Sequence, residues 1–323
     1  MPDPDRLDGS MAGSGDSTRA IFFALGANFA IACAKGVAAF FTGSSAMLAE
    51  TVHSLADCGN QLLLLLGMKQ SKRPPSPDYP LGYGKAIYFW SFLVAVMLFT
   101  VGGMFSLYEG VHKLQHPEPL RQWWWAVGVL VFGIVAEGFS MRACLQEVNK
   151  ARGDRSLWQW FRGSRQAELV VIFGEDLAAL LGLVFALVAV LLAVATGNPA
   201  WDAIGTIAIG TLLIVVAVFV AIEVKAMLIG QGVHPVRQAQ MRTFLESRPE
   251  IARVFNLITL QLGNDVMVSV KAQMREATDA GALLAQINLV EQAVQAEFPE
   301  VRWSFFEPDI ADDDTHGHPA PVN

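Results

Sequence analysis

The chain has 323 residues, of which 53% are hydrophobic and only 16% are charged. Soluble domains usually carry about 25% charged residues, so this composition argues against an ordinary soluble protein and excludes a disordered one. The net charge of −7 is concentrated at the C-terminal end, because residues 236–323 carry 7 Lys and Arg against 13 Asp and Glu. There is no basic face that would indicate nucleic-acid binding. The three cysteines lie in apolar stretches and predict neither a disulfide framework nor a zinc finger.

Residues 1–19 are polar and rich in Asp, Gly and Ser. They lack the basic start and apolar middle of a secretory signal, and their acidic residues are atypical of a mitochondrial transit peptide. We expect a short disordered leader. Six long apolar segments follow, and each meets the length of about 20 residues that a transmembrane helix needs. They are residues 20–41, 44–67, 86–111, 123–148, 167–196 and 201–230.

Positive charges predict how these segments are oriented, because cytoplasmic loops carry an excess of Lys and Arg. Successive loops alternate between two sides of the membrane. The loops on the second side, which follow the first, third and fifth segments, carry only Lys113 and Arg121. The first side, counted with the segment ends that border its loops, is therefore expected in the cytoplasm, together with both termini. Its basic residues are Lys69, Lys72, Arg73, Lys85, Arg142, Lys150, Arg152, Arg155, Arg162 and Arg165.

Residues 233–309 have the composition of a soluble domain. Two alternating apolar and polar stretches flank Gly263-Asn264, which is typical of a β-hairpin. The order helix–strand–strand–helix–strand predicts a small α+β layer, followed by a frayed tail at 310–323. The predicted elements are a helix at 236–247, strands at 254–262 and 266–273, a helix at 278–297 and a strand at 301–306.

Ionisable side chains remain inside the predicted spans, where each costs roughly 2.5–3.5 kcal/mol or more. Such groups usually mark an ion or substrate path. The clearest are His53 and Asp57 in the second segment and Glu175 and Asp176 in the fifth. Further candidates nearer the ends of their segments are Lys35, Glu50 and Glu137; for the two glutamates, a role at a helix end is an equal alternative.

His53 and Asp57 are four residues apart, so a helix presents both on one face. An imidazole nitrogen and a carboxylate oxygen at this spacing suit a divalent transition metal. The fifth segment supplies Asp176, with Glu175 about 100° away around the helix, so the two do not easily reach one ion. The alternatives are a hydrogen-bonded interior histidine and, for the acidic pair, a buried salt bridge to Lys35.

Several motifs together resemble the cation diffusion facilitator family. Residues 43–57, GSSAMLAETVHSLAD, are similar to the second-span signature of that family, and residues 79–85 and 306–309 match its patterns before the third span and at the end of the cytoplasmic domain. The resemblance covers about residues 20–309. Residues 175–182, EDLAALLG, resemble the branch that includes zinc transporter nine.

The resemblance implies a proton-coupled antiporter of divalent metals, usually zinc, that works as a homodimer in the lipid bilayer. It implies six transmembrane helices and a small cytoplasmic ferredoxin-like domain. The transport site takes ligands from the second and fifth spans, which by position are His53, Asp57 and Asp176. The expected domains are a leader at 1–19, a transport domain at 20–232, a dimerisation domain at 233–309 and a tail at 310–323.

The chain departs from the family pattern in ways that bear on metal sites. The usual fifth-span histidine falls at Ile172, so either Glu175 replaces it as a ligand or three side chains and water complete the site. Tyr79 stands where the family usually has His, which argues against a second metal site in that loop. The absence of His and Cys from residues 236–309 argues against regulatory metal sites there.

We expect metal to leave the cytoplasm while protons enter. Metal binding requires a neutral His53 and ionised carboxylates, so protonation from the far side expels the ion. The resemblance favours zinc, although manganese, cobalt and ferrous iron also fit the ligands. The rival hypotheses are a membrane metal sensor or scaffold that does not transport, and a proton-coupled exporter of organic cations. We expect a multi-pass protein of the cell (inner) membrane, no enzyme activity, and no cofactor besides the transported ions.

Overall fold

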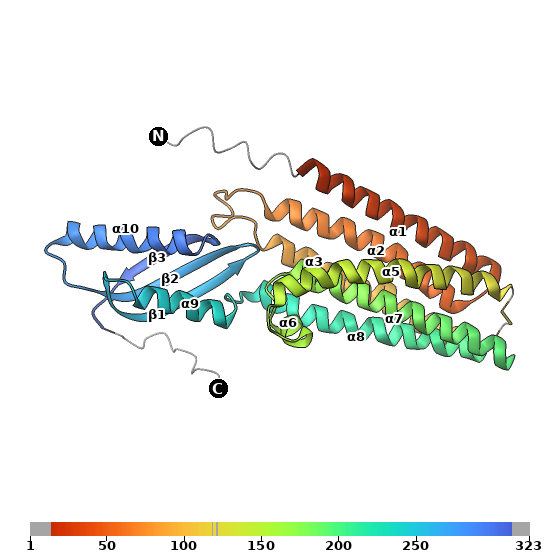
Figure 1. The fold of residues 1–323 in the computed structure, drawn as a ribbon. Coiled ribbons are helices and arrows are strands. Elements are labelled where there is room, and N and C mark those ends of the chain that lie inside the picture. The colour runs from red at the N-terminus through yellow and green to blue at the C-terminus, as the bar shows by residue number, and fades with distance from the viewer. Residues whose placement is uncertain (1–13, 118, 121, 312–323) are drawn as a thin grey trace. The chain divides into compact units, whose positions relative to one another are not determined.

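The computed structural model describes residues 14–117, 119–120 and 122–311, with side chains from Asn28 onward. Most of the predicted leader and tail therefore lies outside the described residues. The N-terminal two thirds of the chain is helical (Figure 1). Its elements are α1 (Ser14–Thr42), α2 (Ser45–Ser71), α3 (Ala86–Met97), the π-helix η2 (Leu98–Met104), α4 (Phe105–Gln115), α5 (Trp123–Arg152), α6 (Leu157–Gly163), α7 (Ala167–Thr196) and α8 (Ala200–Ile229).

Four helical segments among the described residues are long and apolar enough to cross a membrane. They are Ala86–Gln115, which joins α3, η2 and α4, and the helices α5, α7 and α8. α2 has 27 residues but is more polar than these four because of its ionisable and amide side chains. In α1 the described apolar part is short, Asn28–Thr42. The structure therefore supports four of the six predicted spans by length and composition.

The predicted third span differs from expectation because it is not one regular α-helix. Its middle, η2, is π-helical and contains Gly102 and Gly103. A Cβ atom on Gly103 would lie 2.5 Å from Ile214 Cγ1 and 3.3 Å from the carbonyl oxygen of Gly210 in α8. The glycines therefore allow the two backbones to approach closely, as small residues do between membrane helices. Apolar composition alone gave no sign of the π-helix, a feature frequent at functional sites.

The tight turn between α1 and α2 is fixed by a carboxylate from the first turn of α8. Asp202 is completely buried and accepts hydrogen bonds from Ser44 Oγ at 2.6 Å, from the Ser45 backbone N–H at 2.8 Å and from Ser45 Oγ at 2.9 Å. It thus caps the N-terminus of α2 from another helix, where negative charge is favourable. Gly43 has φ +66°, a conformation that glycine adopts without strain.

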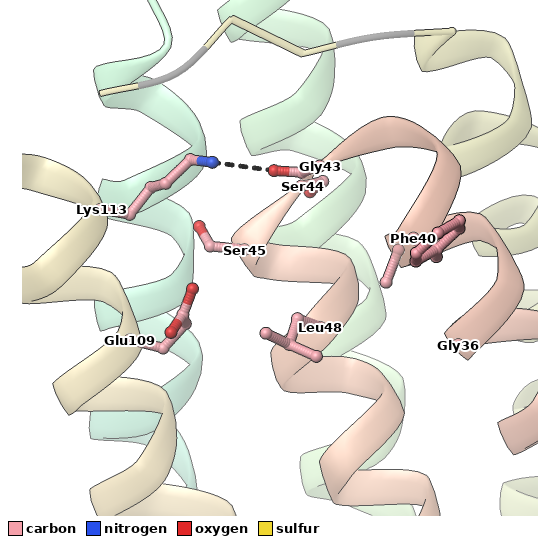
Figure 2. Close-up of a pocket in the computed structure, with 9 residues that line it drawn as sticks. Gly36, Phe40, Gly43, Ser44, Ser45, Leu48, Glu109 and Lys113 are labelled. Carbon is pink, nitrogen blue, oxygen red and sulfur yellow. Dashed lines mark hydrogen bonds between the residues drawn. The ribbon is translucent and has the colours of Figure 1, made fainter. Parts of the chain in front are cut away.

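Figure 2 shows a pocket of about 400 Å³ beside this turn, lined on one side by Phe40 and Leu48 and on another by Glu109 of α4. Lys113, also on α4, donates a hydrogen bond from Nζ to the carbonyl oxygen of Gly43 at 2.9 Å (Figure 2). α4 is thereby tied to the α1–α2 turn, next to the Asp202 contacts.

The C-terminal part is a small sheet domain in which the described strands have the order β1-β2-β3. The predicted hairpin is confirmed: β1 and β2 are antiparallel, joined through Gly263 at φ +68°. β2 and β3 are parallel, which requires the crossover that α10 provides. The elements are α9 (Pro235–Glu246), β1 (Ile251–Leu262), β2 (Asp265–Met274), α10 (Ala280–Glu297) and β3 (Val301–Pro308).

The core of this domain follows from the alternation of the strands. Every second residue of β2 is buried, from Val266 to Ala272, and these side chains share one apolar cluster with Met241 of α9 and with Val290 and Val294 of α10. Both helices therefore bury an apolar face against the sheet.

The chain divides into two compact units, each described here by itself. The helical unit takes the residues up to Gly67, Trp90–Trp160 and Glu168–Val224. The second unit joins Met68–Phe89 and Phe161–Ala167 to the residues from Lys225 onward. All the predicted site residues lie in the helical unit.

Candidate metal centre

α2 presents a buried face of polar side chains to the interior of the helical unit. Glu50, His53, Asp57 and Asn60 follow one another at three- and four-residue steps, which places them on one side of the helix. Glu50, His53 and Asn60 are completely buried, and the side chain of Asp57 is 18% exposed. The predicted shared face of His53 and Asp57 is therefore present.

These buried polar atoms are largely unsatisfied. His53 Nδ1 lies 3.5 Å from Asp57 Oδ1, which is too long for a good hydrogen bond. Both ring nitrogens of His53, Oδ1 of Asp57 and Oδ1 of Asn60 have no hydrogen-bond partner within the described part of the chain. A buried polar atom in this state costs about 1–3 kcal/mol, so a cluster of them indicates atoms kept free for a ligand. The alternative of a hydrogen-bonded interior histidine does not fit His53.

The π-helix lies against this cluster. A Cβ atom on Gly102 of η2 would stand 3.9 Å from His53 Nδ1 and 3.3 Å from Leu213 Cδ1. Because Gly102 has no side chain, the imidazole and a leucine of α8 both fit beside η2. The irregular stretch of the third span is therefore part of the wall around His53.

The two acidic residues of α7 point to different helices. Glu175 is 8% exposed, and its Oε1 accepts a hydrogen bond from Asn60 Nδ2 of α2 at 2.6 Å. Asp176 is half-buried, and its Oδ2 accepts one from Ser140 Oγ of α5 at 3.1 Å. The predicted 100° separation therefore divides the pair between two neighbours. The bond between Asn60 and Glu175 was not predicted from the sequence.

Lys35 of α1 pairs with Glu50, so the alternative of a salt bridge from Lys35 to the acidic pair of α7 is not found among the described residues. The Lys35 ammonium lies 3.1 Å from Glu50 Oε2 and donates a second hydrogen bond to Ser54 Oγ at 2.7 Å. Both charged side chains are completely buried. The alternative role of Glu50 at a solvated helix end does not hold either, because Glu50 is completely buried. Its pairing with Lys35 is what a buried charge requires.

The four predicted ligands are not assembled around one point in this conformation. Within the residues that the structure describes, no group of three or more His, Cys, Asp or Glu side chains is arranged to hold a metal ion. His53 and Asp57 are together, Glu175 is linked to the same helix through Asn60, and Asp176 turns toward α5. Ile172, the position of the histidine expected from the family resemblance, is 39% exposed. The arrangement thus brings together His53 and Asp57, whose atoms could bind a metal, with the carboxylates of α7 close by.

The comparisons with known proteins agree with this picture. Residues 21–229, more than half of the chain, match the family profile described as "Cation efflux transmembrane domain". "Proton-coupled zinc antiporter SLC30A9, mitochondrial" from Xenopus laevis is 33% identical over 270 residues, which is 83% of this chain and 48% of the relative. The human protein of that name is 33% identical over 232 residues, 71% of this chain and 41% of the relative.

"Zinc transporter ZitB" of Escherichia coli (strain K12) is 24% identical over 276 residues, 84% of this chain and 82% of ZitB. The chain thus spans about half the length of the SLC30A9 relatives it matches, and most of the length of ZitB. The matched residues 21–229 include α2 and α7. The chain belongs to the cation efflux family, the cation diffusion facilitators, which are multi-pass membrane transporters.

Proposed function

We propose that this chain is a proton-coupled antiporter that exports divalent metal cations, zinc foremost, from the cytoplasm. The observation that carries the proposal is the buried face of α2, where His53 and Asp57 offer nitrogen and oxygen atoms that no described side chain uses. A path for ions is the usual reason to keep such groups inside a membrane domain. The printed names of SLC30A9 and ZitB, which specify zinc, support this choice of metal.

The substrate ion binds between α2 and α7. Zinc takes four ligands, commonly imidazole nitrogen and carboxylate oxygen. His53 and Asp57 supply two, and Asp176, Glu175, or one of them with water supplies the rest. Glu175 already reaches α2 through Asn60, whereas Asp176 must leave Ser140 of α5 to join the site. A movement of the Asp176 side chain from Ser140 toward α2 therefore accompanies metal binding.

Proton coupling follows from the same ligands. Metal binds to a neutral imidazole and to ionised carboxylates, so protons and metal compete for His53, Asp57 and the α7 acids. Protons that enter from the far side release the metal there, and loss of those protons to the cytoplasm prepares the site for the next ion. The exchange needs no bound cofactor.

The membrane topology is six spans with both termini in the cytoplasm of a cell (inner) membrane. α1 and α2, with 29 and 27 residues, are each about 40 Å long at 1.5 Å per residue, enough to cross a bilayer with the four apolar spans. Residues 20–232 form the transport domain. Residues 233–309 form a ferredoxin-like cytoplasmic domain, which pairs two protomers in a homodimer.

Transport into proteoliposomes that contain a zinc-sensitive dye tests the proposal. With an imposed pH gradient, zinc flux is expected for the wild-type protein and is expected to be lost in Asp57→Ala and in Asp176→Ala. Lys150→Met, which removes an exposed lysine near the end of α5, is the control that should keep its flux. The absence of zinc flux, or unchanged flux in Asp57→Ala, would contradict the proposal. Parallel assays with manganese and cobalt identify the preferred metal.

A metal sensor that does not transport is the second candidate function. It is favoured by the lack of a three-ligand group within the described residues. Saturable zinc binding that depends on His53 and Asp57, without zinc flux under any pH gradient, would identify a sensor.

A further inference from the structure

The buried ion pair of Lys35 and Glu50 is not used by the proposed metal site, although it lies beside it. Removing two charges from water is costly, and apolar replacement of such pairs is often neutral or stabilising. Lys35 and Glu50 are nevertheless both completely buried in a membrane domain. Stability alone therefore gives little reason for this pair.

Glu50 extends the polar face of α2 by one turn beyond His53. The steps from Glu50 to His53 and then to Asp57 are three and four residues, so the three side chains follow one another along the same side of the helix. At 1.5 Å per residue, Glu50 lies about 4.5 Å further along the axis than His53. It does so in the direction of Gly43, the end of α2 opposite to the predicted cytoplasmic end.

The surroundings of Glu50 resemble a cation site with an ammonium group in it. The Lys35 ammonium contacts Glu50 Oε2 at 3.1 Å and Ser54 Oγ at 2.7 Å, a carboxylate and a hydroxyl oxygen. The second carboxylate oxygen, Oε1, is buried and has no hydrogen-bond partner among the described atoms. A Cβ atom on Gly182 would lie 2.6 Å from Oε1. The missing side chain of Gly182 on α7 thus leaves room for Oε1, the oxygen to which Lys35 does not bind.

The charge of Lys35 also acts on the proposed metal ligands. It lies within electrostatic reach of His53 and Asp57, and of Glu137 on α5. A divalent ion bound by His53 and Asp57 is therefore repelled by a fixed positive charge in a medium where such forces are poorly screened. Removal of Lys35 must strengthen metal binding if the ion passes here.

We propose that Glu50 is an additional cation-binding carboxylate on the Gly43 side of His53, and that Lys35 is a tethered cation which holds Glu50 when no metal is present. This inference rests on the proposed transport of divalent cations. An ion that moves from His53 toward Gly43 binds the Glu50 carboxylate and replaces the Lys35 ammonium there. When the ammonium binds Glu50 again, it displaces the ion. Lys35 is thus a positioning residue that keeps metal affinity low and release fast.

The test compares Lys35→Met, Glu50→Gln and the double variant with wild type and with the exposed-lysine control Lys150→Met. Zinc flux in proteoliposomes gives KM and kcat, equilibrium dialysis of the detergent-solubilised protein gives the zinc Kd, and thermal unfolding reports on folding. In Lys35→Met, Kd and KM are expected to fall on the order of tenfold, and kcat falls with them because release is slow. In Glu50→Gln, kcat falls and Kd is expected to rise on the order of tenfold, because the Lys35 charge then acts on His53 and Asp57 without its partner.

The double variant separates a role in transport from a role in folding. It leaves no buried charge without its partner, so its unfolding temperature is expected to return toward the wild-type value, while kcat stays low because the Glu50 carboxylate is missing. Recovery of wild-type zinc flux in the double variant would overturn the inference, and so would unchanged Kd and KM in Lys35→Met. If wild type neither binds nor transports zinc, the proposed function fails and this inference fails with it. If wild-type flux depends on Asp57 but the Lys35 and Glu50 variants behave like Lys150→Met, this inference alone fails.

Discussion

The hydrogen bond from Asn60 to Glu175 makes a specific claim about which acid of α7 faces α2. Asn60 Nδ2 is 2.6 Å from Glu175 Oε1, while Asp176 bonds to Ser140 on α5. Truncation of Asn60 to alanine should therefore lower the free energy of unfolding by removing a contact to Glu175, and it should not affect any contact of Asp176. A double-mutant cycle isolates this pairwise energy, provided that each single change removes the contact without creating another.

The expected coupling follows from the geometry. Interhelical hydrogen bonds in membrane proteins average about 0.6 kcal/mol and reach about 1.7 kcal/mol. The bond here is short, and both side chains are buried. We therefore expect about 1.5 kcal/mol for Asn60→Ala with Glu175→Ala. For Asn60→Ala with Asp176→Ala we expect less than about 0.5 kcal/mol, as for residues that share no partner.

The free energy of unfolding of the purified protein in mixed micelles, titrated with SDS, supplies the four values of each cycle. All the variants leave the Asp202 contacts at the α1–α2 turn intact, so differences report on the α2–α7 contact. Equal coupling in the two cycles, or a larger value for Asp176, would refute the placement of Glu175 against α2. It would also favour Asp176 over Glu175 as the metal ligand that α7 supplies.

The remaining predictions concern helix packing and the sheet domain. Asp202→Asn should lower the free energy of unfolding by about 2 kcal/mol, as measured by SDS titration, because the charged acceptor of three hydrogen bonds is lost. Gly210→Ala should cost about 1–3 kcal/mol by the same measurement, since its Cβ would lie 2.7 Å from the backbone nitrogen of Leu107; Gly128→Ala, with open space around it, is the control and should be near neutral. Partial burial opposes the charged form of Glu300, but the hydrogen bond from Arg237 Nε at 2.7 Å, a backbone hydrogen bond and the charge of Arg237 together outweigh it and lower the pKa of this carboxyl. Because the pKa is lowered by folding, ionised Glu300 stabilises the fold at pH values above its unfolded-state pKa, and this stabilisation is lost as the pH falls through its folded-state pKa. Glu300→Gln should therefore reduce the acid-induced rise in hydrogen exchange over β2 and α9 below about pH 4.5.

The sheet domain was predictable because its signals are local. Alternation with period two and the Gly263-Asn264 turn define the hairpin, and both depend on residues adjacent in the chain. The apolar spans were equally visible as long runs. The π-helix at Leu98–Met104 was not, because every helical period fits a segment that is apolar all round. Its signal is the pair Gly102-Gly103, which acquires meaning only once α8 lies against it.

The site was predictable only as far as one helix determines it. The spacing of His53 and Asp57 places them together whatever their neighbours do. Which acid faces α2, and which carboxylate Lys35 takes, depend on how α1, α5 and α7 are rotated about their axes. A single sequence carries no direct measure of that rotation, so it could not identify Glu50 as the partner of Lys35.

The same rotation bears on Ile172, where the family resemblance leads one to expect histidine. Ile172 and Asp176 are four residues apart and share a face of α7; Ile172 is 39% exposed, whereas Glu175 is 8% exposed and bonded to α2. A histidine at 172 would therefore extend away from His53. We expect zinc flux of Ile172→His with Glu175→Gln to stay within about twofold of Glu175→Gln alone, as for exposed substitutions. Rescue of flux would instead mean that α7 turns by about 100° during transport, so that Asp176 and position 172 replace Glu175 at the metal.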